Sequence, residues 1–260
     1  MAEVIATVQR AAQWVGDGPG ATAPWNPVYR ALVDDAGAPP PRSPAVESTG
    51  ADGADLVRRQ LTAPALLVVA VTAGERTRRL RIGLDPAGAT VERAEDDDAS
   101  RWTELEVAEV PTTVADLLEE SGIDLAPARL EIADDDALRL TPEQTRLAQA
   151  ALADGVPAEE ALATLPGLDP ALQDALTAAG PRLSLSLSLH DPDRQVAEAP
   201  VSWSRLWVTG RSGMYRMDAP GSEPLTVRPV GGGDVLGTLL PILEQGLRFA
   251  AETSTPGGAR

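Results

Sequence analysis

The chain has 260 residues and a formal net charge of −17, and all 22 of its cationic residues are arginine. Such a negative field repels polyanions, so nucleic-acid binding is disfavoured. With no cysteine and one histidine, the chain has neither a disulfide framework nor enough ligands for a zinc site. No apolar run is long enough to cross a membrane, and the N-terminus lacks the pattern of a secretory signal. We expect a cytoplasmic protein without cofactors or metals.

Residues 1–54 are expected to form an N-terminal region of helices and a linker. Apolar residues at helical spacing predict a helix over residues 2–16, and a second short helix is expected over residues 27–35. The stretch 36–54 is rich in Pro, Gly, Ser and Ala and has little to bury, which predicts a mobile loop. No strand is expected in this region.

Residues 55–130 are expected to form a first β-rich half. A short helix near residues 54–61 precedes a hairpin of strands at 65–73 and 77–84 and a third strand at 88–94. Alternating apolar residues predict another strand over 102–110. A helix over 113–121 follows Pro111, a residue common at helix starts.

Residues 131–180 are expected to be a helical insert. Thr141 and Pro142 match an N-cap followed by proline at the first helical position, so a helix is predicted to begin there. The same start signal recurs before two further short helices, over 157–165 and 169–180.

Residues 181–260 are expected to form a second β-rich half and a C-terminal helix. Its first strand, 183–189, alternates leucine with serine, which is typical of a half-buried antiparallel strand with one wet side. A strand bearing two tryptophans, a glycine-containing turn at 210–213 and a strand ending in Pro229-Val230 come before the helix.

The two β-rich stretches are interpreted as copies of one unit. The first runs from Leu61 to Leu125 and the second from Leu176 to Leu247, and each reads as β-β-β-α. Glu109-Val110-Pro111 is matched with Arg228-Pro229-Val230 as the end of the third strand. The predicted fold is therefore α+β: one globular body with a central, mostly antiparallel sheet from two pseudo-two-fold-related halves, flanked by helices.

No residue pattern indicates catalysis. His190 comes at the end of a strand before Asp191, where a turn is the favoured interpretation over a catalytic base. Gly231-Gly232-Gly233 precedes a helix and is interpreted as a flexible cap rather than an anion site, because Asp234 would repel an anion. The acidic triplets at 96–98 and 134–136 lack the spacing of a calcium loop. The chain is therefore expected not to be an enzyme.

Binding of another protein is the favoured activity, and copy two with the insert is the expected surface. Aromatic residues are scarce here, so a cluster of them indicates an anchor in the core or at an interface. Small serines would let a covering element approach the sheet, and leucines of the insert would wall an apolar groove. The candidate partner-binding residues are Trp203, Trp207, Tyr215, Ser184, Ser186, Leu147, Leu152 and Leu162.

The second copy resembles the EspG family, the cytoplasmic chaperones of actinobacterial type VII secretion. The resemblance is carried by a tryptophan-bearing strand, the Gly210-Arg211 turn, the Val227-Arg228-Pro229 element and the helix after it. Copy one is similar to the first half of that family. The resemblance implies a chaperone or adaptor that binds a helical secretion substrate, of the PE/PPE-like or WXG type, and shields its apolar tip.

Two other classes remain open. One is a structural or regulatory subunit of a larger secretion or phage-like assembly, and the other is a small hydrolase, kept because carboxylates are plentiful. A chaperone should purify as a monomer, which is favoured here, or in a one-to-one complex with its cargo. An assembly subunit should instead copurify in a larger particle.

Overall fold

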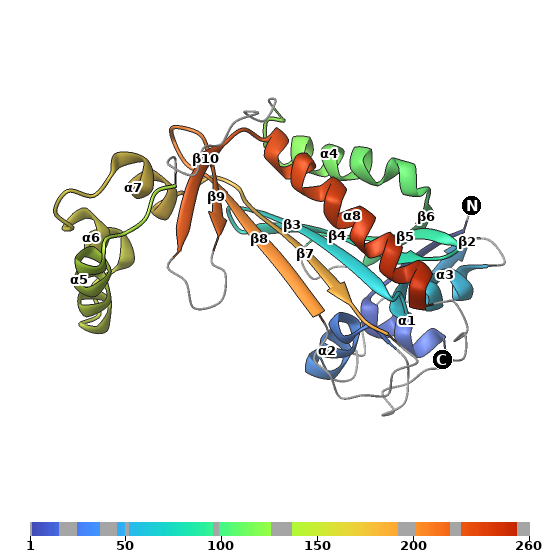
Figure 1. The fold of residues 1–260 in the computed structure, drawn as a ribbon. Coiled ribbons are helices and arrows are strands. Elements are labelled where there is room, and N and C mark those ends of the chain that lie inside the picture. Colours follow the sequence, from blue (N-terminus) through green and yellow to red (C-terminus); the bar gives the residue numbers. More distant parts are fainter. Residues whose placement is uncertain are drawn as a thin grey trace, which may run out of the picture.

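The fold is built on one large sheet. The computed structural model describes residues 2–15, 25–36, 46–49, 52–95, 99–125, 137–191, 201–218 and 225–253. These form a ten-stranded sheet in the order β10-β9-β8-β7-β3-β4-β5-β6-β1-β2, and all neighbouring strands are antiparallel. Helices lie on both faces (Figure 1). The predicted α+β class, with a mostly antiparallel sheet flanked by helices, is confirmed.

The described elements follow each other in this order along the chain. The strands are β1 Glu3–Ala6, β2 Glu47–Thr49, β3 Ala65–Ala73, β4 Arg76–Asp85, β5 Gly88–Glu95, β6 Ser100–Leu105, β7 Arg182–Leu189, β8 Val201–Thr209, β9 Met214–Asp218 and β10 Thr226–Val230. The helices are α1 Val8–Trp14, α2 Pro27–Ala36, α3 Gly53–Leu61, α4 Val110–Glu120, α5 Pro142–Ala153, α6 Ala158–Ala163, α7 Pro170–Leu176 and α8 Gly233–Thr253, with a 3-10 turn η1 at Val107–Glu109 before α4.

Two runs of the chain share one element order. Strands β3 to β6 are followed by α4, strands β7 to β10 are followed by α8, and the first strands of the two runs pair in the middle of the sheet. Each run thus has four strands before its helix, one more than the predicted β-β-β-α unit. Superposition of the runs as pseudo-two-fold halves stays a prediction.

The predicted match between the prolines of the two copies is wrong. Pro229 lies inside β10, whereas Pro111 lies at the start of α4. The expected strand over 102–110 also ends early, at Leu105. The side chain of Glu106 caps the backbone at Glu109 and the Glu109 side chain caps Glu106 in return, so the chain turns into a helix there.

The N-terminal region differs most from expectation. Residues 2–16 were expected to be one helix, but Glu3–Ala6 form β1, which pairs with β6 and β2, and the helix begins only after Thr7. The Thr7 side chain accepts a hydrogen bond from the Arg10 backbone N–H at 3.3 Å, which fixes the helix start. The predicted linker contains β2, and its residues 37–45 lie outside the described residues.

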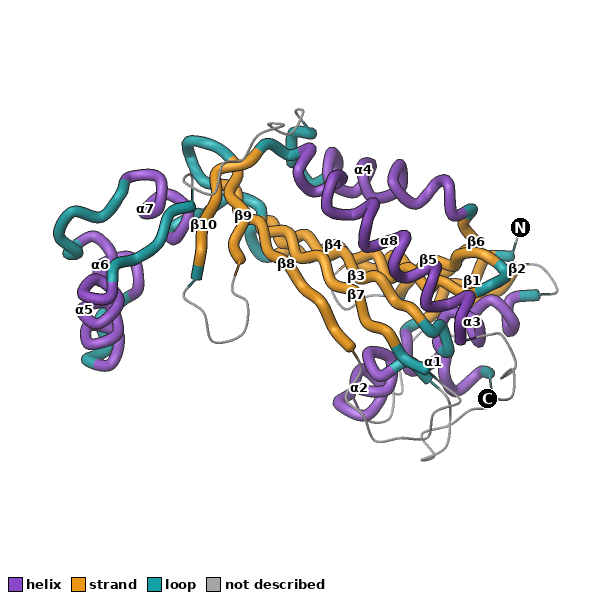
Figure 2. Tube along the Cα trace, in the orientation of Figure 1, coloured by secondary structure: helices purple, strands orange, loops and turns teal. Residues whose placement is uncertain are grey.

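The helices form layers on the two faces of the sheet. One face, called the α8 face, is covered by α4 and α8 and contains the largest apolar core, including Leu67, Ile82, Leu117, Leu185, Trp207 and Leu239. On the other face, called the serine face, α1 to α3 pack over β1 and β4 to β6. The helical insert packs on the same face at the β8–β10 end, mainly through α7 (Figure 2).

Two glycines allow α8 to lie close to its neighbours. A Cβ at Gly246 would meet Leu84 Cδ1 at 2.8 Å, so the helix packs directly on the leucines of the sheet. Gly232, just before the helix, touches the backbone at Asp124, and a side chain there would collide with that carbonyl. Within the Gly231-Gly232-Gly233 run, Gly232 is therefore required for close packing against this backbone.

Both outer edges of the sheet are shortened or occupied. At β10, the backbone N–H and C=O of Val227 exchange hydrogen bonds of 2.9 and 2.8 Å with Leu138, outside the sheet. Pro229, the next residue of β10 facing outward, has no N–H to offer. At the opposite edge, β2 has three residues.

Candidate partner-binding surface

The predicted alternation along β7 is confirmed. Leu183, Leu185 and Leu187 are buried in the core of the α8 face. The serines point the other way: Ser184 is exposed and Ser186 is half-buried. Ser188 is buried, and its hydroxyl makes no hydrogen bond to any described residue. The wet side expected for this strand is therefore present at Ser184 and Ser186 and ends before Ser188.

Small side chains continue from β7 onto its neighbours. Ser184 pairs with Ala70 of β3 and Leu206 of β8, and Ser186 pairs with Val68 and Ser204. Directly paired residues of antiparallel strands lie on the same face, so these side chains form one surface. Leu206 of β8, at the margin of this surface, is 38% exposed. We call this surface the serine strip: Val68, Ala70, Ser184, Ser186, Ser204 and Leu206.

The N-terminal helices border the strip on one side and are fixed to the sheet by a buried polar cluster. The Tyr29 hydroxyl donates to Glu92 Oε2 at 2.7 Å, and Glu92 Oε1 accepts from Arg81 and Ser100 at 2.6 Å each. Gln60 Nε2 lies 2.7 Å from the Tyr29 hydroxyl. Burial, together with the negative charge of Glu92, raises the pKa of Tyr29 well above its ordinary value. The tyrosine therefore stays protonated and acts as a fixed donor.

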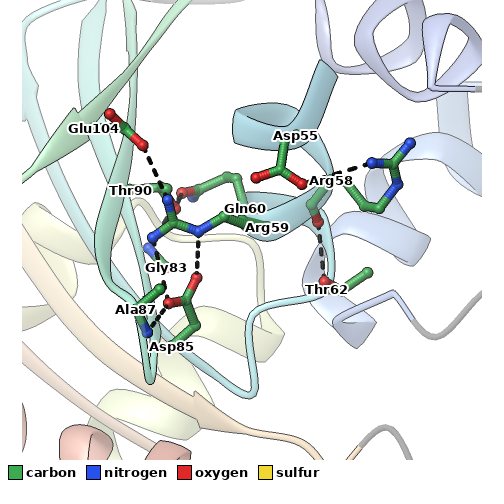
Figure 3. A network of polar contacts seen from close by, with 10 residues as sticks. All are labelled: Asp55, Arg58, Arg59, Gln60, Thr62, Gly83, Asp85, Ala87, Thr90 and Glu104. Carbon is green, nitrogen blue, oxygen red and sulfur yellow. Dashed lines mark hydrogen bonds and ion pairs between the residues drawn. The ribbon is translucent and has the colours of Figure 1, made fainter. Parts of the chain in front are cut away.

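Helix α3 adds a second set of polar contacts to the same border. Gln60 Oε1 accepts hydrogen bonds from Thr90 Oγ1 and from the Gly83 backbone N–H, as Figure 3 shows. Arg59 Nε donates to Asp85 at 2.8 Å, and Arg59 Nη1 lies 3.0 Å from Glu104 Oε1. The hydrogen bond to Asp85 raises the pKa of the guanidinium. These contacts fix α3 across β4 to β6, on the side of the sheet next to the strip.

The helical insert borders the strip on the other side. Its predicted start is confirmed, because Thr141 Oγ1 accepts from the Gln144 N–H at 3.2 Å. Helix α7 packs on β10. Helices α5 and α6 pack on each other, and these two helices extend beyond the sheet edge in Figure 1. Leu147 and Leu162 are half-buried, and Leu152 is 50% exposed.

A carboxylate of α7 clamps the insert to the β8–β9 turn. Asp174 accepts hydrogen bonds from the backbone N–H groups of Arg211 and Ser212 and from the Tyr215 hydroxyl, each at 2.9 Å. The backbone donors at Ser212 and Arg211 lower the pKa of Asp174, because they stabilise its charged form. Tyr215 is buried against Leu172, so its aromatic ring serves this contact.

The tryptophans do not join the serine strip. Trp207 pairs with Leu183 and Trp203 with Leu187, which places both on the α8 face, whereas Tyr215 pairs with Val208 on the serine face. The expectation that these aromatics and the serines form one surface is therefore wrong for the tryptophans. Trp207 has no exposed surface, which favours the core interpretation that the sequence left open. Trp203 is half-buried beside the same core.

His190 lies at a strand end, as expected. Its backbone N–H donates to the Pro64 carbonyl at 2.7 Å. Burial, with the charge of Arg30 nearby, lowers the pKa of its imidazole. Within the described ranges, no three His, Asp or Glu side chains gather as a metal site would require. The acidic triplets at 96–98 and 134–136 lie outside the described residues.

Comparison with known proteins gives no family assignment. No family model matches the chain, and no curated protein matches it at a significant level. Among the described helices, none combines the length and apolarity that crossing a membrane would need.

Proposed function

We propose that this protein is a non-enzymatic cargo chaperone or adaptor that binds a helical type VII secretion substrate in the cytoplasm. The cargo would be of the PE/PPE-like or WXG type, and binding would shield its apolar tip. The resemblance to the EspG family suggests this role. The observation that carries the proposal is the serine strip, a partly exposed sheet surface of mostly small side chains between two helical borders.

The shape and chemistry of the strip suit a helix. Serine and alanine side chains are short, so a helix can approach the strands closely, and Val68 and Leu206 offer apolar contacts at its margins. Recognition of an amphipathic helix in a groove depends on such spaced apolar anchors. The exposed Leu152 of α5 is a further apolar contact that the insert can offer to a long cargo.

The borders favour binding without large rearrangement. The buried contacts of Tyr29, Gln60 and Glu92 on one side and the Asp174 clamp on the other fix the width of the surface before any cargo arrives. A preformed site loses less conformational entropy on binding than a flexible one.

A pull-down with matched leucine variants tests the proposal. The tagged chain is co-expressed with candidate helical secretion substrates of the PE/PPE-like or WXG type, and the captured cargo is quantified. Leu206→Asp places a charge in the strip, whereas Leu240→Asp places one on α8, on the opposite face, at a residue that is 54% exposed. We expect Leu206→Asp to reduce capture about tenfold and Leu152→Asp to reduce it less, with Leu240→Asp close to the parent.

Circular dichroism and thermal unfolding first establish that each variant is folded. Light scattering on the captured complex should give a one-to-one stoichiometry. Equal capture by the parent and by a folded Leu206→Asp variant would place the cargo elsewhere, and a much larger particle would favour a subunit of an assembly.

A further inference from the structure

The helical insert is joined to the sheet through a small apolar contact. Helix α7 and the residues that flank it make this contact, whereas α5 and α6 lie away from the sheet (Figure 1). The buried side chains of the contact are Leu172, Ala175 and Ala178 from the insert and Val208, Tyr215 and Val227 from the sheet. One short helix therefore carries most of the burial that holds the insert in place.

The polar contacts between the insert and the β8–β9 turn are open to solvent. The hydrogen bonds that Asp174 accepts from the backbone N–H groups of Arg211 and Ser212 lie in exposed positions. Water competes for the same groups, so such bonds add less to the stability of the contact than buried ones would. The docking of the insert is therefore weak compared with the pairing of the central strands.

The insert has little core of its own. Helix α5 buries Gln144 and Ala148, and α6 buries Ala161. Gln144 Nε2 donates to the Pro166 carbonyl at 3.0 Å, which ties α5 to the turn after α6. The three helices have 12, 6 and 7 residues, and isolated helices of this length are marginal in water. Helices that leave the sheet together should therefore lose their structure together.

We propose that the insert is a releasable cover: α5, α6 and α7 open as one unit while the sheet stays folded. Regions with few buried apolar contacts open at a lower free-energy cost than the core of a fold. The large core of the α8 face, which includes residues of β3, β4 and β7, remains intact in this opening.

The release uncovers an apolar surface next to the serine strip. Leu206 of the strip pairs with Met217, and Met217 pairs with Val227, so all three lie on the serine face. Val208 and Tyr215 pair beside them on the same face. The docked insert covers this end of the face, and the open form extends the strip with apolar side chains. The inference concerns the opening alone and stands whether or not the strip binds cargo.

Native-state hydrogen exchange on the full chain tests the opening. We expect the amides of α5 to α7 to share one exchange behaviour and to exchange at least about tenfold faster than those of β3 and β7. Asp174→Asn weakens the docking and should speed exchange in α5, α6 and α7 together, by about fivefold, with β3 unchanged. Asp154→Asn is the matched control, because this exposed aspartate ends α5 outside the clamp, and it should change these rates less than about twofold.

A disulfide provides the opposite perturbation. The chain has no cysteine, so one engineered pair has a single way to connect. A Cβ at Gly210 would lie 2.7 Å from Asp174 Cγ, which places Asp174→Cys with Gly210→Cys within reach of a disulfide. Oxidation should slow exchange throughout α5, which lies outside the bridge, by about tenfold or more relative to the reduced protein.

Two results would overturn the inference. If neither Asp174→Asn nor the disulfide changes exchange in α5, the helices open separately rather than as one unit. If the insert exchanges as slowly as β3, it opens only when the whole chain unfolds. Should the bridge fail to form, the comparison of Asp174→Asn with Asp154→Asn decides between the same outcomes.

Discussion

The indole N–H of Trp207 donates to the Asp234 carboxylate at 2.8 Å, and this contact joins β8 to the first turn of α8. Both side chains are buried, and the second oxygen of Asp234 accepts from Arg216 at 2.9 Å. A carboxylate in the first turn of a helix also interacts favourably with the helix dipole. The sequence suggested that Asp234 would repel an anion, but in the structure it is itself the anion bound at the helix start.

Replacing Asp234 with alanine should therefore destabilise the fold. The change leaves the Trp207 N–H and the Arg216 guanidinium without their shared acceptor, which costs about 2–4 kcal/mol. Urea unfolding followed by tryptophan fluorescence measures the effect. The exposed Asp154, at the end of α5, provides a control in Asp154→Ala, which should change the free energy of unfolding by less than about 0.5 kcal/mol.

The buried cluster around Glu92 should behave as a coupled unit. Glu92→Gln leaves Arg81 buried without a negative partner and should cost about 3 kcal/mol in unfolding free energy. The double variant Glu92→Gln with Arg81→Met removes that uncompensated charge and should be more stable than Glu92→Gln alone. A double-mutant cycle by chemical unfolding gives the coupling, and additive effects of the two changes would contradict the arrangement.

The Asp174 clamp should make stability depend on pH in the acid range. Because its pKa is lower in the folded chain than in the unfolded one, the stabilising contribution is complete above the unfolded value of about 3.9 and is lost as pH falls through the lowered folded value. Asp174→Asn should flatten the stability profile below pH 4 and loosen the β8–β9 turn. Acid unfolding of both proteins, together with hydrogen exchange at Arg211 and Ser212, measures this effect.

His190→Ala should leave cargo binding almost unchanged, since His190 belongs to no metal-binding cluster among the described residues and lies at the end of β7, outside the serine strip. Its lowered pKa means that the unfolded chain takes up the proton more readily, so the parent should lose some stability as pH falls through about 6.5. His190 is the single histidine of the chain, and the variant should lack that slope. A large loss of function in a stable His190→Ala protein would reopen the enzyme interpretation.

The parts of the fold that the sequence predicted well are those set by neighbouring residues. The β3–β4 hairpin and the α5 start are examples, because alternation and the Thr141 cap are local signals. Strand β1 was missed because Val4 and Ile5 fit a helix face equally well, and its partner β6 lies about a hundred residues further along the chain. Local propensity cannot show that such a distant edge is available.

The candidate site was only partly predictable, because the face on which a side chain lies depends on how neighbouring strands pair. Serine and leucine alternation gave the two faces of β7 directly. Whether Trp207 and Tyr215 share a face depends on the β8–β9 pairing, in which Trp207 lies opposite Arg216 and Tyr215 opposite Val208. A shift of one residue would have put both rings on one side. The buried contacts of Tyr29, Gln60 and Glu92 likewise depend on the packing of separate segments.

The occupied edge at Val227, the outward proline at 229 and the short β2 have a consequence for solubility. A sheet of ten strands is a large template, and an open edge would recruit strands from other molecules. Here the outward backbone groups of Val227 in β10 are already hydrogen-bonded to Leu138, and Pro229 has no N–H to donate. At the other edge, β2 has three residues. These two edges therefore disfavour growth of the sheet by the edge-to-edge addition of strands from other molecules.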